Sequence, residues 1–275
     1  MKNAVKKIVA VILTGIMVFT LASCSVGDKI RTYFNEETTV TEPYTNKSEK
    51  PATQTEIVEY FNAVSADLKN SKPANITMSR EFSAGDFESQ NKHLSASFKT
   101  VADFMINNSE FLEKGINGQE ALENGTITDI VHVYPIEGST DSSNVLFKHV
   151  KLAACSQTSD HFVITIDFKD DADPLAEGGL SEVFNPDNKD IILKELEGVS
   201  DLMTIEDYSV EYNGCRIVCT VDRATDRIVS ATYTRVIKVT AVVNGHGEFA
   251  SVQNEEITFN VTENENYTIE WEKAE

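Results

Sequence analysis

Basic side chains are scarce in this chain, which has 24 Lys and Arg against 44 Asp and Glu and a formal net charge of −20 at pH 7. Proteins that bind nucleic acid by neutralising phosphates need clustered Lys and Arg, which this composition does not supply. The same deficit predicts repulsion from anionic lipid headgroups, so we expect membrane attachment to come from a lipid rather than from a basic face. We therefore do not expect this protein to bind nucleic acid.

Recognisable catalytic motifs are also absent from the sequence. It contains no GxSxG elbow, no HExxH pair, no phosphate-binding loop and no glycine-rich dinucleotide motif. The five histidines are scattered, at His93, His132, His149, His161 and His246. Pairs of carboxylates can be drawn at will from 44 acids, so they do not indicate glycoside hydrolysis. We therefore predict a protein that is not an enzyme, and a hydrolase without a recognisable motif ranks behind the binding functions considered below.

Cysteine is rare, with four residues at Cys24, Cys155, Cys215 and Cys219. There is no CxxC pair and no set of histidines at ligand spacing, so we expect neither a metal nor another cofactor. The acidic loop over residues 167–177 has several carboxylates that calcium could use, but it lacks the EF-hand spacing. A solvated turn is the simpler interpretation of that loop.

The N-terminus carries the most specific signal in the chain. Lys2, Lys6 and Lys7 precede an apolar run over residues 8–21, which is the arrangement of a secretory signal peptide. The run has 14 residues, fewer than the roughly 20 that a membrane-spanning helix needs. At its end, Leu21-Ala22-Ser23-Cys24 resembles a bacterial lipobox.

This resemblance implies a bacterial lipoprotein in which Cys24 is lipidated and becomes the mature N-terminus. More than one acyl chain makes such anchoring stable, so we expect the protein at the cell membrane, lipid-anchored on its extracytoplasmic face. The membrane is then a partner through the lipid on Cys24. Removal of residues 1–23 deletes three lysines and no acid, which leaves a formal charge of −23.

Three segments are predicted along the chain. Residues 1–23 form the lipoprotein signal peptide, residues 24–54 a flexible polar tether that begins at the lipidated Cys24, and residues 55–275 a single domain. The tether has few apolar residues and cannot bury enough surface to fold. As a coil of about 30 residues it would hold the domain roughly 30 Å from the membrane.

Two amphipathic helices are predicted at the start of the domain, over residues 55–70 and 90–107. Thr53 and Glu56 have the spacing of a capping box before the first helix, and Pro73 marks its end. Apolar residues recur at helical spacing in both segments: Ile57, Phe61, Val64 and Leu68, then Leu94, Phe98, Val101 and Met105. Residues 76–82, between the helices, are predicted as a strand or an extended connector.

From about residue 126 the apolar residues alternate, which predicts strands. We expect them over residues 127–134, 150–155, 162–168, 215–221, 228–243, 257–261 and 267–271, with a short helix at 190–196. Residues 222–226 and 263–266 are predicted as polar turns. Asn244-Gly245 is a strong signal for a hairpin turn, because both residues accept positive φ.

These patterns predict an α+β fold, in which the two N-terminal amphipathic helices pack on a mainly antiparallel, curved sheet formed by the C-terminal two-thirds of the chain. Two features, the strand from Asn213-Gly214-Cys215-Arg216-Ile217 to Val221-Asp222 and Cys155 followed by residues 162–168, resemble uncharacterised surface lipoproteins of clostridia-like bacteria. That resemblance implies no activity. A looser similarity in layout is to the lipoprotein-carrier fold, a curved antiparallel sheet that helices close around an apolar cup.

Three residues besides Cys24 are candidates for chemistry. Cys215 and Cys219 lie about 13 Å apart on one strand, too far for a bond to each other, so any disulfide involves Cys155. We favour a bond between Cys155 and Cys215, and buried free thiols are the alternative.

Arg235 is the one charge on the apolar face of its strand and is a candidate contact for an anionic ligand. A β-bulge, a ladder slip or an ion pair with an acid are the alternatives for Arg235.

The sequence therefore predicts a membrane-anchored extracytoplasmic lipoprotein with a non-catalytic domain. Its partner is an unknown protein or a small ligand. The alternative is a carrier for a hydrophobic ligand such as a lipid, which requires an apolar cavity between the helices and the sheet.

Overall fold

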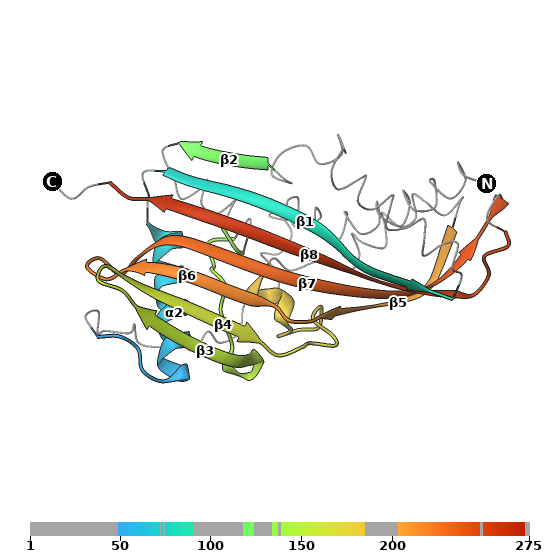
Figure 1. The fold of residues 1–275 in the computed structure, drawn as a ribbon, viewed down its shortest axis with the longest axis horizontal. Helices are drawn as coiled ribbons and strands as arrows, with labels where there is room; N and C mark the ends of the chain where they lie inside the picture. Colours follow the sequence, from blue (N-terminus) through green and yellow to red (C-terminus); the bar gives the residue numbers. More distant parts are fainter. Residues whose placement is uncertain are drawn as a thin grey trace.

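The computed structural model describes residues 49–71, 73, 75–90, 118–123, 134–136, 139–184, 203–247 and 250–272. Within them one α-helix, α2 (Gln54–Asn70), packs on an open antiparallel sheet of eight strands (Figure 1). The strands are β1 (Asn75–Ser89), β2 (Gly118–Glu123), β3 (Val150–Gln157), β4 (His161–Phe168), β5 (Met203–Tyr212), β6 (Arg216–Asp222), β7 (Arg227–Gly245) and β8 (Glu255–Glu270). Two short 3-10 helices, η4 (Phe147–His149) and η5 (Leu180–Val183), flank the hairpin of β3 and β4. The predicted α+β class is confirmed.

β7 is the strand on which the sheet is built. The strand order is β2-β1-β8-β7-β6-β4-β3, and β5 pairs with β7 as well. β7 is 19 residues long, so its first half pairs with β6 and its second half with β5. The other side of β7 pairs with β8 along most of its length, and Figure 1 shows the two as long neighbouring arrows. Three strands therefore depend on β7 for backbone hydrogen bonds.

α2 forms because its sequence satisfies the first turn and presents one apolar face. Thr53 Oγ1 accepts from the backbone N–H of Glu56 at 3.2 Å, and Glu56 Oε2 accepts from the N–H of Thr53 at 3.0 Å, which confirms the predicted capping box. These backbone donors, Thr53 first and then Ala52, hold the pKa of Glu56 below its usual value. The predicted apolar stripe is buried, as Ile57, Phe61, Val64 and Leu68. No helix in the described ranges is long and apolar enough to span a lipid bilayer.

The last turn of α2 holds a buried lysine. Lys69 is 1% exposed, and its Nζ donates to the backbone oxygens of Tyr134 at 2.6 Å, Ile136 at 2.9 Å and Ser139 at 3.1 Å. These carbonyls replace the water that the ammonium loses on burial. These hydrogen bonds link the segment around Tyr134 to the helix. The charge of Lys69 also lies at the negative end of the helix dipole, where a cation is stabilised.

One face of the sheet is apolar and the other polar, because side chains alternate along each strand. The residues predicted to point inward on two strands are buried: Phe162, Ile164, Ile166 and Phe168, then Cys215, Ile217, Cys219 and Val221. On the polar face, Thr232 donates to Asn266 at 2.9 Å and Thr234 donates to Asn264 at 2.8 Å across β7 and β8. The core lies between the apolar face and α2, which contacts β3, β4 and β7.

The turn predicted at residues 263–266 is wrong, because β8 runs through it without a break. Glu263 and Glu265 are 2% and 5% exposed, and they point inward in phase with Val261 and Tyr267. β8 is held extended by β1 on one side and β7 on the other. Two ladders of backbone hydrogen bonds thus override the local preference of a polar segment for a turn.

The hairpin turn predicted at Asn244-Gly245 is also wrong. Both residues stay in β7, opposite Thr204 and Met203 of β5, and the chain reverses between the end of β7 and the start of β8. The predicted turn at residues 222–226 is confirmed: Asp222 Oδ1 accepts from the backbone N–H of Thr225 at 2.9 Å.

The inward position at the start of β7 also differs by one residue from the prediction. Ile228 is buried there in place of Val229, because the register of β6 and β7 shifts between Thr220 and Val221. Such a shift moves one residue to the opposite face without ending the strand.

The sheet is open and does not curl, so the prediction of a curved sheet is wrong in this respect. Closure would require β2 to pair with β3, and these strands lie at opposite ends of the strand order. Residues 76–82 are a strand, as part of β1. The second predicted helix at 90–107 (apart from Gln90), the strand predicted at 127–134 (apart from Tyr134) and the helix predicted at 190–196 lie outside the described residues.

Replacing the cap residue tests how far α2 depends on its first turn. We expect Thr53→Ala to lower the free energy of unfolding by about 1 kcal/mol, because the N–H of Glu56 loses its acceptor. Thr55→Ala is the matched control, since Thr55 is an exposed threonine at the second position of the same helix. Urea denaturation measures the free energy of unfolding of both variants. An equal loss in the two would contradict the capping role of Thr53.

Candidate functional site

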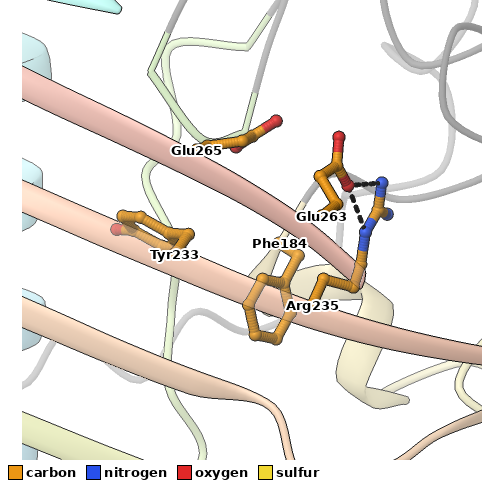
Figure 2. A pocket seen from close by; sticks show the side chains of 5 residues that line it. All are labelled: Phe184, Tyr233, Arg235, Glu263 and Glu265. Carbon is orange, nitrogen blue, oxygen red and sulfur yellow. Dashed lines mark hydrogen bonds and ion pairs between the residues drawn. The ribbon is translucent and has the colours of Figure 1, made fainter. Parts of the chain in front are cut away.

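Charged side chains are buried together on the apolar face of β7 and β8. Tyr233 and Arg235 come from β7, Glu263 and Glu265 from β8, and Phe184 from the end of η5; we name these five residues the Arg235 cluster (Figure 2). Arg235 and Glu263 are each 2% exposed. Residues two apart on a strand share a face, which is why each strand contributes a pair.

Arg235 and Glu263 form a buried ion pair. They lie directly opposite each other in the register of β7 and β8. Arg235 Nε donates to Glu263 Oε2 at 2.8 Å, and Nη2 donates to the same oxygen. Arg235 Nη1 donates to the hydroxyl of Tyr212 at 3.2 Å, and the guanidinium lies 5.8 Å from the centre of that ring. Of the alternatives for Arg235, the structure shows an ion pair with an acid, and its contact with an anionic ligand stays a prediction.

The neighbouring polar groups of the cluster are bonded within the protein. Glu265 Oε2 accepts from the hydroxyl of Tyr267 at 2.9 Å. The hydroxyl of Tyr233 donates to that of Tyr134 at 3.0 Å, and their rings meet edge to face with centres 5.8 Å apart. Burial raises the pKa of Tyr233 far above its usual value, so its phenol stays protonated.

The Arg235 cluster is closed to ligands as the structure stands. The hollow between its five side chains has no room for a water molecule. A catalytic acid or base must lie within hydrogen-bonding reach of a substrate, and here the charges face each other. In Figure 2 the guanidinium of Arg235 is turned toward Glu263. The geometry thus gives the cluster a structural role in joining β7 to β8.

Cys155, Cys215 and Cys219 are free thiols, and the disulfide predicted between Cys155 and Cys215 is not formed. β4 lies between β3 and β6, and its Ile164 is opposite Cys155 on one side and Cys219 on the other. Two strand spacings separate Cys155 from Cys219 by about 10 Å, and Cys215 lies further along β6, whereas a disulfide needs Cα atoms within about 7 Å. Burial raises the pKa of Cys215 to about 12. Cys24 lies outside the described residues.

The acidic loop after β4 is a hydrogen-bonded turn. Asp171 Oδ2 accepts from the backbone N–H of Leu180 at 2.8 Å, and Asp167 pairs with Arg216 at 2.5 Å. Asp171 therefore holds the loop, while Asp167 lies in β4 and pairs with its neighbour in β6. In the part of the chain that the structure describes, no group of three or more His, Cys, Asp and Glu is arranged to hold a metal ion.

Three large apolar side chains of the described residues are exposed, and they lie close together in the sequence. Leu146, Phe147 and Leu152 are 37%, 51% and 50% exposed and lie within seven residues of each other in the chain. They belong to η4, the residue before it, and β3, which is the last strand of the sheet. We name these three residues the η4–β3 patch. Single exposed apolar residues are ordinary, whereas a group of them marks an interaction surface.

Sequence reasoning missed both the acids of the Arg235 cluster and the η4–β3 patch. For Glu263 and Glu265 a signal existed, because they continue the alternation from Val261 to Tyr267. For the patch no comparable signal exists, since the exposure of Phe147 depends on which elements cover η4.

No protein-family model matches the chain, and no curated protein or solved structure shows significant similarity to it. The resemblance to bacterial surface lipoproteins therefore stays a prediction from the sequence.

Removing the buried carboxylate tests the ion pair. Glu263→Gln removes the negative charge that faces the buried guanidinium of Arg235, so we expect the free energy of unfolding to fall by about 3–5 kcal/mol. Glu256→Gln removes the same charge from an exposed position on β8 and is expected to change stability by no more than about 0.5 kcal/mol. Chemical denaturation measures the free energy of unfolding of the two variants. A similar small loss of stability in both would contradict a buried ion pair.

Thiol labelling tests the arrangement of the cysteines. In the folded chain we expect a thiol reagent to modify Cys155, which is partly exposed, and to spare Cys215 and Cys219, which are 1% and 0% exposed with pKa values raised by burial. After unfolding without a reductant, all three should react. Mass spectrometry identifies which cysteines the reagent has modified. Failure of Cys155 and Cys215 to react in the unfolded chain would show a disulfide and contradict the free thiols.

Proposed function

We propose that this protein is a membrane-anchored extracytoplasmic lipoprotein whose α+β domain acts by binding and not by catalysis. The observation that carries the binding role is the η4–β3 patch, because grouped apolar side chains such as Phe147 and Leu152 gain free energy when a partner covers them. The anchor rests on the resemblance of Leu21-Ala22-Ser23-Cys24 to a lipobox.

The Arg235 cluster gives no support to a catalytic role. Its buried charges are bonded to each other, and the hollow beside them has no room for a water molecule. An active site needs titratable groups that converge on space for a reacting atom. A hydrolase without a motif has no specific observation in its favour among the described residues.

The carrier alternative requires an apolar cavity, and the hollow beside Arg235 offers it no support because it is charged and closed. The second predicted helix at 90–107, which would enclose such a cavity, lies outside the described residues except for Gln90. Native mass spectrometry of the exported, unlipidated chain separates the two functions. A retained lipid-sized mass that is lost on denaturation would favour the carrier, and a bare mass would favour the binding protein.

Substitution of the predicted acylation site tests the anchor. We expect the wild-type chain to fractionate almost entirely with membranes and to carry an acyl mass on Cys24, and we expect Cys24→Ser to move to the soluble fraction. Cys155→Ser is the matched control, because it removes a thiol from the folded domain and leaves the anchor in place. Membrane retention of Cys24→Ser through a lipid would contradict the proposed attachment.

A further inference from the structure

We propose that a second copy of this chain packs face to face on the outer face of the sheet, which is the face opposite α2. The contact is made by two rows of short, uncharged side chains that cross six strands, and we name them the outer rows. This inference goes beyond the proposed function and does not depend on it, because it uses neither the lipid on Cys24 nor the η4–β3 patch.

The register of the strands joins these side chains into one surface. Residues directly opposite each other on neighbouring strands share a face, so each row runs from β1 through β8, β7, β6 and β4 to β3. The first row consists of Thr77, Thr268, Ser230, Thr220, Val163 and Ser156. The second row lies beside it, two residues along each strand, from Ser79 on β1 to Ala154 on β3. Both rows are exposed or half-buried, and Figure 1 shows α2 crossing the opposite face of the sheet.

The outer rows carry no charge, although charged residues make up 25% of the chain and its net charge is −20. Two copies of so acidic a chain repel each other over most of their surface. A region without acids is where a second copy meets the least repulsion. The outer rows are such a region, and they continue without interruption across the sheet.

Charges at the borders of the outer rows are in part paired with opposite charges. On one border Arg216 forms an ion pair with Asp167 at 2.5 Å, and on the other border Asp222 lies opposite Arg227. The exposed acids at the borders are Glu81 and Glu270. This residual negative charge opposes the approach of a second copy, and salt screens it. We therefore expect the association to strengthen as the salt concentration rises.

Polar side chains of the outer face are hydrogen-bonded to each other across β7 and β8. Thr232 Oγ1 donates to Asn266 Oδ1 at 2.9 Å, and Thr234 Oγ1 donates to Asn264 Oδ1 at 2.8 Å. Burial of a polar group costs least when the group already has a hydrogen-bond partner. The methyl groups of the threonines and of Val218 supply apolar contact between these bonds. A second sheet can therefore cover this face without leaving these bonded groups unpaired.

The outer face is flat and large enough for a weak dimer. Its short side chains suit the separation of about 10 Å at which two sheets pack face to face. β8 extends the uncharged surface, since its outward residues from Thr258 to Thr268 are all threonine or asparagine. From the spacing of strands and residues, the uncharged surface covers about 600 Å². A standard interface buries about 800 Å² of each partner, so we expect a dissociation constant of about 100 µM or tighter rather than a permanent dimer.

The composition of the outer rows favours a second copy over other partners. Nucleic acid and anionic lipid require clustered Lys and Arg, and the acyl boundary of a membrane requires large apolar side chains. The outer rows contain neither kind of residue. A second copy presents the same flat and uncharged surface, which is what a two-fold symmetric interface requires.

Analytical ultracentrifugation of the exported chain tests the proposal. The chain carries Cys24→Ser, so that no acyl group drives association, and a reductant prevents disulfides between copies. We expect the average mass to rise from monomer toward dimer as the concentration approaches about 500 µM. The dimer should be more abundant at about 500 mM salt than at about 50 mM, because salt screens the repulsion between the two acidic chains.

Variants separate a contact at the outer rows from a general effect of charge. Val218→Lys places a charge in the second row, where it would meet the same charge of the other copy, so we expect the dissociation constant to rise at least about tenfold. Ala66→Lys adds the same charge at an exposed position of α2 and should not weaken the dimer. Both variants change the net charge equally. An unchanged melting temperature verifies folding, and Thr165→Lys on β4 repeats the test if Val218→Lys is unstable.

Methyl NMR locates the contact. The methyl signals of Val163 and Val218, on the outer face, should shift as the concentration rises, whereas those of Val221 and Val239, which are buried on the inner face, should not.

Four results decide the outcome. A dimer that Val218→Lys weakens and Ala66→Lys does not weaken supports the proposal. A chain that stays monomeric up to about 500 µM at both salt concentrations overturns it. A dimer that Val218→Lys leaves unchanged places the contact on another surface and also overturns it. A monomer whose Val163 and Val218 signals shift when soluble peptidoglycan fragments are added assigns the outer face to a glycan instead. None of these results bears on the anchor, which the Cys24→Ser fractionation tests separately.

Discussion

The ion pair of Arg235 and Glu263 is the constraint on which the rest of the sheet depends. It fixes β7 against β8, and β7 in turn holds β5 and β6. A slip of one residue would turn every inward side chain of β8 to the polar face, which the core forbids. A slip of two residues keeps the faces, and an apolar ladder of similar residues would tolerate it. The ion pair does not, because one slip would place Arg235 opposite Val261. The other slip would place Arg235 opposite Glu265 and leave the buried carboxylate of Glu263 opposite Ile237. We infer that the pair selects one register.

Burying these charges costs solvation, and the neighbourhood of the pair shows how that cost is offset. Tyr212 supplies a further hydrogen bond to Arg235, and Tyr267 supplies one to Glu265. A fully bonded polar network inside a core specifies a unique arrangement, whereas a partly bonded one destabilises it. The interior charges of the described fold thus determine structure. In the proposed function, a partner contacts the surface, where the three residues of the η4–β3 patch are exposed.

Features set by neighbours in the sequence could be predicted, and features set by distant contacts could not. The cap at Thr53 and the stripe that includes Phe61 depend on residues within one helix, so both were predictable. Glu263 continues the alternation of its strand, but a carboxylate is unfavourable in a core unless it is paired, and the partner that makes its burial possible lies 28 residues away. A disulfide between Cys155 and Cys215 was predicted because the sequence does not give the strand order, which places β4 between the two cysteines. The exposure of Phe147 likewise depends on the tertiary arrangement.

A double-mutant cycle on Arg235→Met and Glu263→Leu, read as the free energy of unfolding, tests the central role of the ion pair most directly. Each single variant removes one member of the Arg235–Glu263 pair and leaves the other charge buried, whereas the double variant removes both. The account predicts that the double variant is more stable than either single variant, with a coupling energy at the upper end of the range of about 0.5–3 kcal/mol seen for residues in contact. Additive losses in the cycle would show that the two side chains do not depend on each other, and would contradict a register fixed by their pairing.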